Sequence, residues 1–289
     1  MAHAQGSFCV TTVTSKAYQH YLPIFIYTLR KNVPDAFIRT FHRGKLDSIT
    51  LDALNFMHDH GIRFDMPIED YKTDFPHNTS TTNSLRFLIE PTYFREDYVY
   101  ITDVDFVFLA HEPPINEYYI DKCRAWKQPY WARRGFKRII GTDERAKRIA
   151  GGGVLVTLDW WLATEKLRER YLGELMDGTI GQQREDDEIM LWYLCAGSGM
   201  KCPTKRGNRR RKVYKEIHCG DFKFSHRWTK EKKMKKKISK GNYLKWHRLE
   251  EDPVWRELVD ICSKCDMVKG IIDNIRSYMS DRKTITFED

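Results

Sequence analysis

Apolar and polar positions alternate with two different periods along the first 65 residues, and these periods predict strands and helices in turn. Residues 7–13 carry no charge and are rich in β-branched side chains, which is typical of a buried strand. Between residues 16 and 31 the apolar positions recur at helical spacing. The same criteria predict a second strand at 36–41, a helix from 47 or 48 to 59, and a third strand at 62–64. This order indicates a doubly wound sheet of parallel strands.

The rest of the chain continues this α/β pattern. An apolar stretch at 97–109 is interrupted by two acidic residues, and a glycine-led strand is expected at 151–158. Helices are expected at 80–94, with a break at Pro91, and at 159–176, 185–195 and 252–279. Residues 213–218 are expected to form the last strand. Residues 131–148 are expected to form a loop with a short helix. No linker divides the body, so we expect a catalytic domain over residues 1–228 and a basic helical extension over residues 229–289.

Composition narrows the class of protein. With 41% hydrophobic and 31% charged residues, the chain is not collagen-like, low-complexity or wholly disordered. No apolar run approaches the roughly 18 residues of a membrane-spanning helix. Residues 1–6 lack the pattern of a signal peptide. Seven widely spaced cysteines do not suggest a disulfide framework. We therefore expect a cytoplasmic, reducing location.

Charge is distributed unevenly. Of the 49 Lys and Arg residues, 19 lie between Lys201 and Arg248, against three of the 40 acidic residues. The rest of the chain is net acidic. Such a basic segment attracts polyanions, whether nucleic acid, anionic lipid or the phosphates of a small ligand.

Asp103 and Asp105 are the strongest candidates for chemistry. They directly follow the apolar stretch 98–101 and precede another apolar run. Ligands of open α/β sheets bind at the carboxyl ends of the strands, and carboxylate oxygens are ligands that Mg²⁺ and Mn²⁺ prefer. The alternative is a pair of solvated acids in a turn, but leaving them unpaired beside apolar neighbours would be costly.

The segment YITDVDFVFL resembles the strand and DxD motif of GT-A-fold glycosyltransferases, especially family 8. Further segments extend this resemblance in order over residues 7–228: FCVTTVTSKAY, TTNSLRFLIEPTY, GGGVLV, REDDEIMLW and IHCGDFK. The resemblance implies a GT-A-like, doubly wound (Rossmann-like) mixed sheet. It also implies an enzyme that transfers a sugar from a nucleotide-sugar donor, most often a UDP-sugar, with Mn²⁺ or Mg²⁺ as cofactor.

Roles follow from the matching positions. The resemblance makes Asp103, Asp105 and His218 the metal ligands. His226 is the alternative to His218, because the spacing from His218 to Lys223 is one residue shorter than the family pattern and no Pro-Trp follows. Catalysis is expected from Asp186 and Asp187. Donor-binding positions are Thr11, Thr12, Tyr18, Arg86, Asp103, Glu188 and Lys223, and acceptor-side positions are Gly152 and Gly153.

Ordinary structural roles remain open for several of these residues. Arg86 could pair with Glu90 one helical turn away, and Tyr18 could pack in the core. Acids at a helix start stabilise the helix dipole, so 186–188 could serve that purpose alone. Cys262 and Cys265 form a CxxC without a second pair, which does not indicate zinc.

The basic segment has more cations than one diphosphate needs. Aromatic residues lie among them, a pattern typical of nucleic-acid binding. The candidate contacts are Arg209, Arg210, Arg211, Lys235, Lys236 and Lys237. We therefore expect a modified base in DNA or RNA as acceptor, with a cell-surface glycan or a lipid-linked saccharide at an anionic membrane as the alternative. Two other classes stay open: a non-catalytic nucleic-acid-binding protein and a nucleotidyltransferase.

Overall fold

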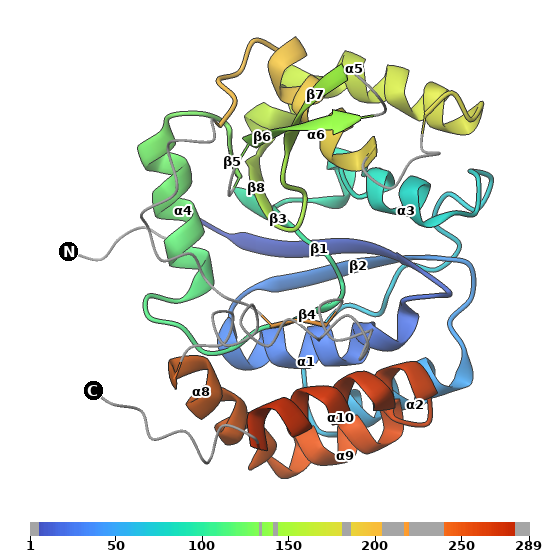
Figure 1. Ribbon diagram of the computed structural model, residues 1–289, viewed down its shortest axis with the longest axis vertical. Coiled ribbons are helices and arrows are strands. Elements are labelled where there is room, and N and C mark those ends of the chain that lie inside the picture. Colours follow the sequence, from blue (N-terminus) through green and yellow to red (C-terminus); the bar gives the residue numbers. More distant parts are fainter. Residues whose placement is uncertain are drawn as a thin grey trace.

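The computed structural model describes residues 6–132, 135–140, 144–180, 186–203, 217–219 and 240–280. A five-stranded sheet with the order β2-β1-β3-β8-β5 lies between two layers of helices (Figure 1). Strands β1 (Phe8–Ser15), β2 (Phe37–Arg43) and β3 (Tyr98–Ile101) run parallel. Strand β8 (Val154–Thr157) is antiparallel to β3 and to β5 (Tyr130–Ala132). The sheet is therefore mixed, in an α/β fold as expected.

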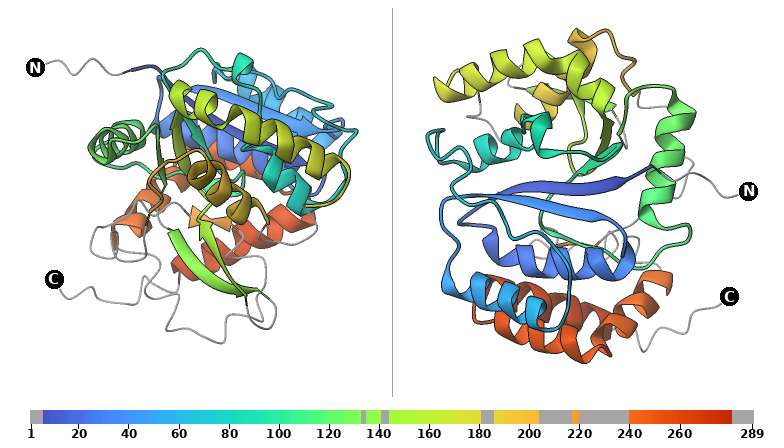
Figure 2. Two further views of the ribbon diagram at one scale, coloured as in Figure 1. Left: turned by 90° about the horizontal axis from the view of Figure 1, so that it is seen from above. Right: turned by 180° about the vertical axis from the view of Figure 1, so that it is seen from behind.

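One face of the sheet is covered by helices from both ends of the chain. The first are the 3-10 helix η1 (Gln19–Tyr21), α1 (Leu22–Asn32) and α2 (Ser48–Asp59). The C-terminal helices α8 (Lys240–Glu250), α9 (Pro253–Cys262) and α10 (Asp266–Ser280) join the same buried cluster. In Figure 1 and in the right view of Figure 2, α9 and α10 lie beyond α1 and beside α2. The division at residue 228 stays a prediction, although these helices share the core of the body.

The contact between α1 and α9 is polar as well as apolar. Asp252 caps α9 by accepting a hydrogen bond from the Val254 N–H at 3.0 Å. The same carboxylate pairs with Lys31 at 2.8 Å and accepts from the Tyr27 hydroxyl at 2.6 Å. Trp255 packs, fully buried, beside the Tyr27 ring. One acidic residue therefore starts α9 and ties it to α1.

The opposite face carries α3 (Thr79–Leu85), α5 (Leu158–Met176) and α6 (Asp186–Gly197) around a second buried cluster. Helix α4 (Ile115–Trp126) packs at the β5 and β8 end of the sheet. Two smaller pairings lie outside the main sheet. They are β4 (Phe106–Val107) with β9 (Ile217–His218), and β6 (Gly135–Ile140) with β7 (Glu144–Ile149). The β6–β7 hairpin projects at one side of the molecule in the left view of Figure 2.

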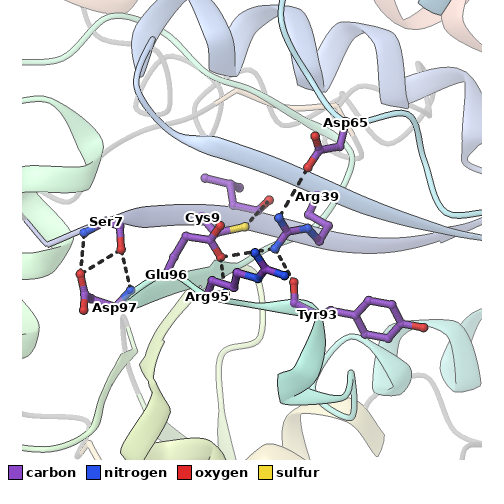
Figure 3. A network of polar contacts seen from close by, with 9 residues as sticks. Ser7, Cys9, Arg39, Asp65, Tyr93, Arg95, Glu96 and Asp97 are labelled. Atoms are coloured by element: carbon purple, nitrogen blue, oxygen red, sulfur yellow. Dashed lines mark hydrogen bonds and ion pairs between the residues drawn. The ribbon is translucent and has the colours of Figure 1, made fainter.

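A polar network fixes the edge of the sheet at which β1 and β3 begin (Figure 3). Asp97 accepts a hydrogen bond from the Ser7 N–H at 2.7 Å, and the Asp97 N–H donates to the Ser7 hydroxyl at 2.9 Å. Arg39 on β2 pairs with Glu96 at 3.3 Å and with Asp65 at 3.6 Å. Because these contacts lie where the strands start, they hold the register of the sheet at the edge opposite the carboxyl ends.

Several predicted elements are correct. Helix α2 begins after Asp47, whose carboxylate accepts a hydrogen bond from the Thr50 N–H at 2.9 Å. The predicted helices at 159–176 and 185–195 appear as α5 and α6. The region predicted as one or two helices at 252–279 holds α9 and α10, and α8 precedes them unforeseen.

Other predictions are wrong for local reasons. The first helix begins at Leu22 rather than at residue 16, because Pro23 lacks an amide hydrogen and belongs in a first turn. Residues 62–64 form no strand; instead Ile68 makes an isolated bridge with Phe41. The helix predicted at 80–94 stops at Leu85, and Glu90 before Pro91 is extended.

The region 131–148 is also different from the prediction. It continues from β5 into the β6–β7 hairpin, whose strands pair from Gly135 with Ile149 to Ile140 with Glu144. Its many charges suggested a loop, but cross-strand hydrogen bonding decides the structure there. In the described part of the chain, no helix combines the length and apolar character needed to cross a membrane.

Candidate functional site

The segment after β3 carries the two predicted carboxylates to the carboxyl end of the sheet. The Thr102 N–H donates to the Thr11 carbonyl at 3.1 Å, and the Thr102 hydroxyl donates to the Gly152 carbonyl at 3.2 Å. These bonds hold the segment between β1 and the glycine run before β8. The side chain of Asp103 keeps 26% exposure, whereas Asp105 is 8% exposed. The buried Val104 lies between them and fixes the turn.

Arg86 connects this segment to the helical layer. It follows directly on α3, and its side chain is only 4% exposed. Its Nη1 pairs with Asp103, and its Nη2 pairs with Asp187 at 2.7 Å. Glu90, the alternative partner, instead pairs with Lys72 at 2.6 Å and accepts from the Tyr71 hydroxyl at 3.1 Å. The structure thus aims Arg86 at the carboxyl end of the sheet.

The start of α6 supplies two further carboxylates. Asp187 is buried against Arg86, and Glu188 is partly buried beside it. One oxygen of Glu188 accepts from the Gly151 N–H at 3.4 Å, and the other pairs with Arg148 at 3.3 Å. The pKa of Glu188 is raised, mainly by burial and secondly by the negative charge of Asp187. The positive charges of Arg148 and Arg86 lower this pKa and so reduce the rise. The side chain of Asp186, the other predicted catalytic residue, lies outside the described residues.

The glycine run before β8 packs closely against this cluster. A Cβ at Gly151 would lie 2.8 Å from Nη2 of Arg86 and 3.2 Å from Oδ2 of Asp187. A Cβ at Gly152 would lie 3.1 Å from Oδ2 of Asp103, and one at Gly153 would collide with the Tyr100 ring. Close packing therefore accounts for all three glycines, and the acceptor-side role of Gly152 and Gly153 stays a prediction.

Strand β1 places two threonines at the same edge of the sheet. Thr11 and Thr12 are fully buried, and neither hydroxyl has a hydrogen-bond partner among the described residues. Side chains alternate along a strand, so the two hydroxyls lie on opposite faces of the sheet. Tyr18 lies in the turn after β1, with its ring 6.0 Å from that of Tyr21, and packs at the margin of the core. Their donor-binding roles stay predictions.

The predicted third metal ligand comes from β9. In the β4–β9 pairing His218 is the partner of Phe106, and the Cys219 N–H donates to the Asp105 carbonyl at 2.7 Å. The backbone of His218 therefore lies next to Asp105, although its side chain is not among those described. The described residues contain no group of three or more His, Cys, Asp or Glu side chains that could hold a metal ion. Within them, Asp103 and Asp105 are the predicted oxygen ligands, and this donor type fits a hard divalent cation.

Other predicted residues lie outside the described part of the chain. They are Lys223, the rival ligand His226, and the candidate nucleic-acid contacts Arg209, Arg210, Arg211, Lys235, Lys236 and Lys237. Their roles stay predictions.

Arg148, by contrast, was not found from the sequence. It sits in a run of basic residues, and only the pairing of β7 with β6 and its contact with α6 place it at the site. An arginine directly before the buried Ile149 and the glycine run was the available signal.

No family model matches the chain, and no curated protein is similar to it in sequence. Several of the solved structures that are similar to it are glycosyltransferases. GlyE of Streptococcus pneumoniae TIGR4 is 14% identical with a TM-score of 0.46, covering 94% of this chain and 64% of GlyE. In its apo form the match covers 65% of this chain and 43% of GlyE, at 13% identity and a TM-score of 0.39. The chain thus spans less than two thirds of GlyE.

Two further solved structures are similar. The galactosyltransferase LgtC, in complex with donor and acceptor sugar analogues, is 15% identical with a TM-score of 0.37, covering 63% of this chain and 69% of LgtC. The mannosyltransferase PcManGT of Pyrobaculum calidifontis, in complex with GDP-Man and Mn²⁺, is 9% identical with a TM-score of 0.45. The match covers 97% of this chain and 89% of PcManGT.

Proposed function

We propose that this chain transfers a sugar from a nucleotide-sugar donor, a UDP-sugar, to an acceptor hydroxyl, with a divalent cation bound at Asp103 and Asp105. The observation that supports this proposal is the bridge made by Arg86. Its buried guanidinium joins Asp103, at the end of a central strand, to Asp187, at the start of a helix. Carboxyl ends of strands are where open α/β sheets bind ligands.

The charge of the site favours a bound cation. Among the described residues, three carboxylates (Asp103, Asp187 and Glu188) pair with two guanidiniums (Arg86 and Arg148). A nucleoside diphosphate is itself strongly negative, so this site would repel it without additional positive charge. A divalent cation held by Asp103 and Asp105, with His218 as third ligand and His226 as its rival, would neutralise the departing diphosphate. Mn²⁺ and Mg²⁺ both accept such oxygen ligands.

The chain's own residues would orient the sugar. Arg86 fixes the Asp187 carboxylate, and the Gly151 N–H together with Arg148 fixes Glu188. Fixed carboxylates can accept hydrogen bonds from sugar hydroxyls, which is the role proposed for Glu188. If the transfer inverts the anomeric carbon, Asp186 or Asp187 would take the proton of the acceptor hydroxyl. Thr11, Thr12, Tyr18 and Lys223 are proposed to contact the nucleotide.

The acceptor that we propose is DNA or RNA. This rests on the basic segment of the sequence, in which Arg209–Arg211 and Lys235–Lys237 exceed what one diphosphate requires. Binding through these cations would weaken steeply with salt. Transfer to a glycan or a lipid-linked saccharide, with no effect of nucleic acid, would assign the acceptor to those classes instead. Salt-sensitive nucleic-acid binding with no use of any nucleotide sugar would support the non-catalytic binding protein.

Metal dependence offers the direct test. Purified protein is screened against a panel of nucleotide sugars with Mn²⁺, and unfolding temperature is measured with UDP and Mn²⁺ together and singly. We expect UDP to stabilise the protein only with the metal, and EDTA to abolish turnover. Asp103→Asn and Asp105→Asn should lose turnover, whereas Asp273→Asn, in an exposed pair with Lys269 on α10, should not. Full activity of both site variants in EDTA would refute the proposal.

A further inference from the structure

The β6–β7 hairpin reaches the site through one buried side chain. Arg148, the last residue but one of β7, has a side chain only 2% exposed. Burying a guanidinium is unfavourable unless a carboxylate or several acceptors compensate it. Arg148 pairs with Glu188, at 3.3 Å, on the first turn of α6. A buried pair between a hairpin and a helix start therefore stands beside the proposed catalytic acids.

The contacts continue from this pair into the cluster around Arg86. Glu188 accepts a hydrogen bond from the Gly151 N–H at 3.4 Å. Gly151 in turn lies so close to Nη2 of Arg86 and Oδ2 of Asp187 that no Cβ fits there. A change in the position of Glu188 would therefore move the glycine run that packs against Arg86 and Asp187.

Among the side chains that the structure describes, the charged groups that act on Glu188 are Asp187 on α6, Arg86 after α3 and Arg148 on β7. Burial and Asp187 favour the neutral acid, whereas Arg148, the Gly151 N–H and Arg86 favour the carboxylate. Arg86 is already paired with two other acids. Arg148 is thus the cation that pairs with Glu188.

We propose that Arg148 is a positioning residue for sugar transfer: its guanidinium keeps Glu188 ionised and oriented so that its oxygens can accept hydrogen bonds from the donor sugar. This inference rests on the proposed function. It assigns a role to one residue of the hairpin, whose strand β7 packs against α6. A merely structural arginine would affect stability but not KM for the donor or the acid limb of kcat/KM.

The test measures that ionisation directly. The pKa of Glu188 is obtained by ¹³C NMR titration of its side-chain carboxyl, assigned with Glu188→Gln. In Arg148→Met we expect this pKa to rise by about one unit, because a nearby cation is lost. Arg148→Lys retains the charge and should keep the pKa near that of the wild type. Arg168→Met is the matched control: Arg168 is also buried but donates to the Ile89 and Trp161 carbonyls, so its loss should leave the Glu188 pKa unchanged.

Kinetics supply the second readout. The acid limb of kcat/KM should move to higher pH in Arg148→Met, with KM for the donor raised more than kcat is lowered, and it should stay in place in Arg148→Lys. If Arg148→Met does not fold, Arg148→Gln replaces it, with the same expected shift. An unchanged Glu188 pKa in the folded neutral variant overturns the inference. A wild-type protein that transfers no sugar refutes the proposed function instead, and the NMR titration still decides whether Arg148 keeps Glu188 ionised.

Discussion

A single added methyl group at Gly151 should disturb the site more than its size suggests. The backbone of Gly151 is not in the left-handed region, so alanine is excluded there by space and not by conformation. Its Cβ would lie 2.8 Å from Nη2 of Arg86, whereas ordinary contact begins at 3.4 Å. Arg86 must therefore retreat by roughly half an ångström. It is held in place by ion pairs to Asp103 and to Asp187, the latter at 2.7 Å.

We expect Gly151→Ala to lower the free energy of unfolding by about 1–3 kcal/mol, the usual effect of overpacking. Displacing Arg86 should also lower kcat/KM by roughly 10- to 100-fold, since misplacement on this scale disturbs reactive geometry. Urea denaturation and steady-state transfer kinetics measure the two effects. The matched control is Gly270→Ala in α10, where the added Cβ meets nothing within 4 Å. It should stabilise the protein by up to about 1 kcal/mol without changing kcat/KM. Wild-type stability and kinetics in Gly151→Ala would refute the described packing.

Two further predictions concern the supports of the site. Asn78 caps α3 by accepting a hydrogen bond from the Thr81 N–H at 2.7 Å. Asn78→Ala should therefore lower the free energy of unfolding, measured by urea denaturation, by about 1 kcal/mol. An unchanged free energy of unfolding would contradict the role of this cap. Burial and, to a smaller extent, the charge of Lys245 on α8 lower the pKa of His111 from 6.5 to about 4. Between these two pH values the unfolded chain therefore binds more protons than the folded protein. Stability should therefore fall as pH decreases from about 6.5 to about 4. His111→Gln should lessen this fall in urea denaturation at several pH values, and the exposed His58→Gln should not.

Local signals in the sequence were sufficient for much of the fold. The pattern of apolar positions predicted β1, β2 and α2, and the start of α2 predicted at residue 47 or 48 is correct. The errors came where a proline or the pairing of one strand with another outweighed the local pattern. The hairpin β6–β7 is held by cross-strand hydrogen bonds between basic segments, which no local periodicity shows. Residues 62–64 do not pair with β2. The chain continues to Ile68, which forms the bridge with Phe41 of β2.

The site was predictable in part for the same reason. Asp103 and Asp105 stand at the end of an apolar strand, which is a local signal of a sheet-edge site. Arg86 pairs with Asp103 and Asp187, and not with Glu90, because of the position at which α3 ends. Pro91 determines this position only indirectly. Arg148 has no local signal beyond its place before a buried isoleucine. Its role depends on a contact between β7 and α6.

The arrangement of charges explains why these distant segments come together in this way. Three carboxylates, Asp103, Asp187 and Glu188, lie against Arg86 and Arg148 and would repel one another in the absence of these cations, and each buried acid would be costly. Arg86 bridges Asp103 and Asp187, and Arg148 pairs with Glu188. Two guanidiniums leave one negative charge in excess among these three carboxylates. The divalent cation that we propose at Asp103 and Asp105 would offset this excess and allow a diphosphate to bind.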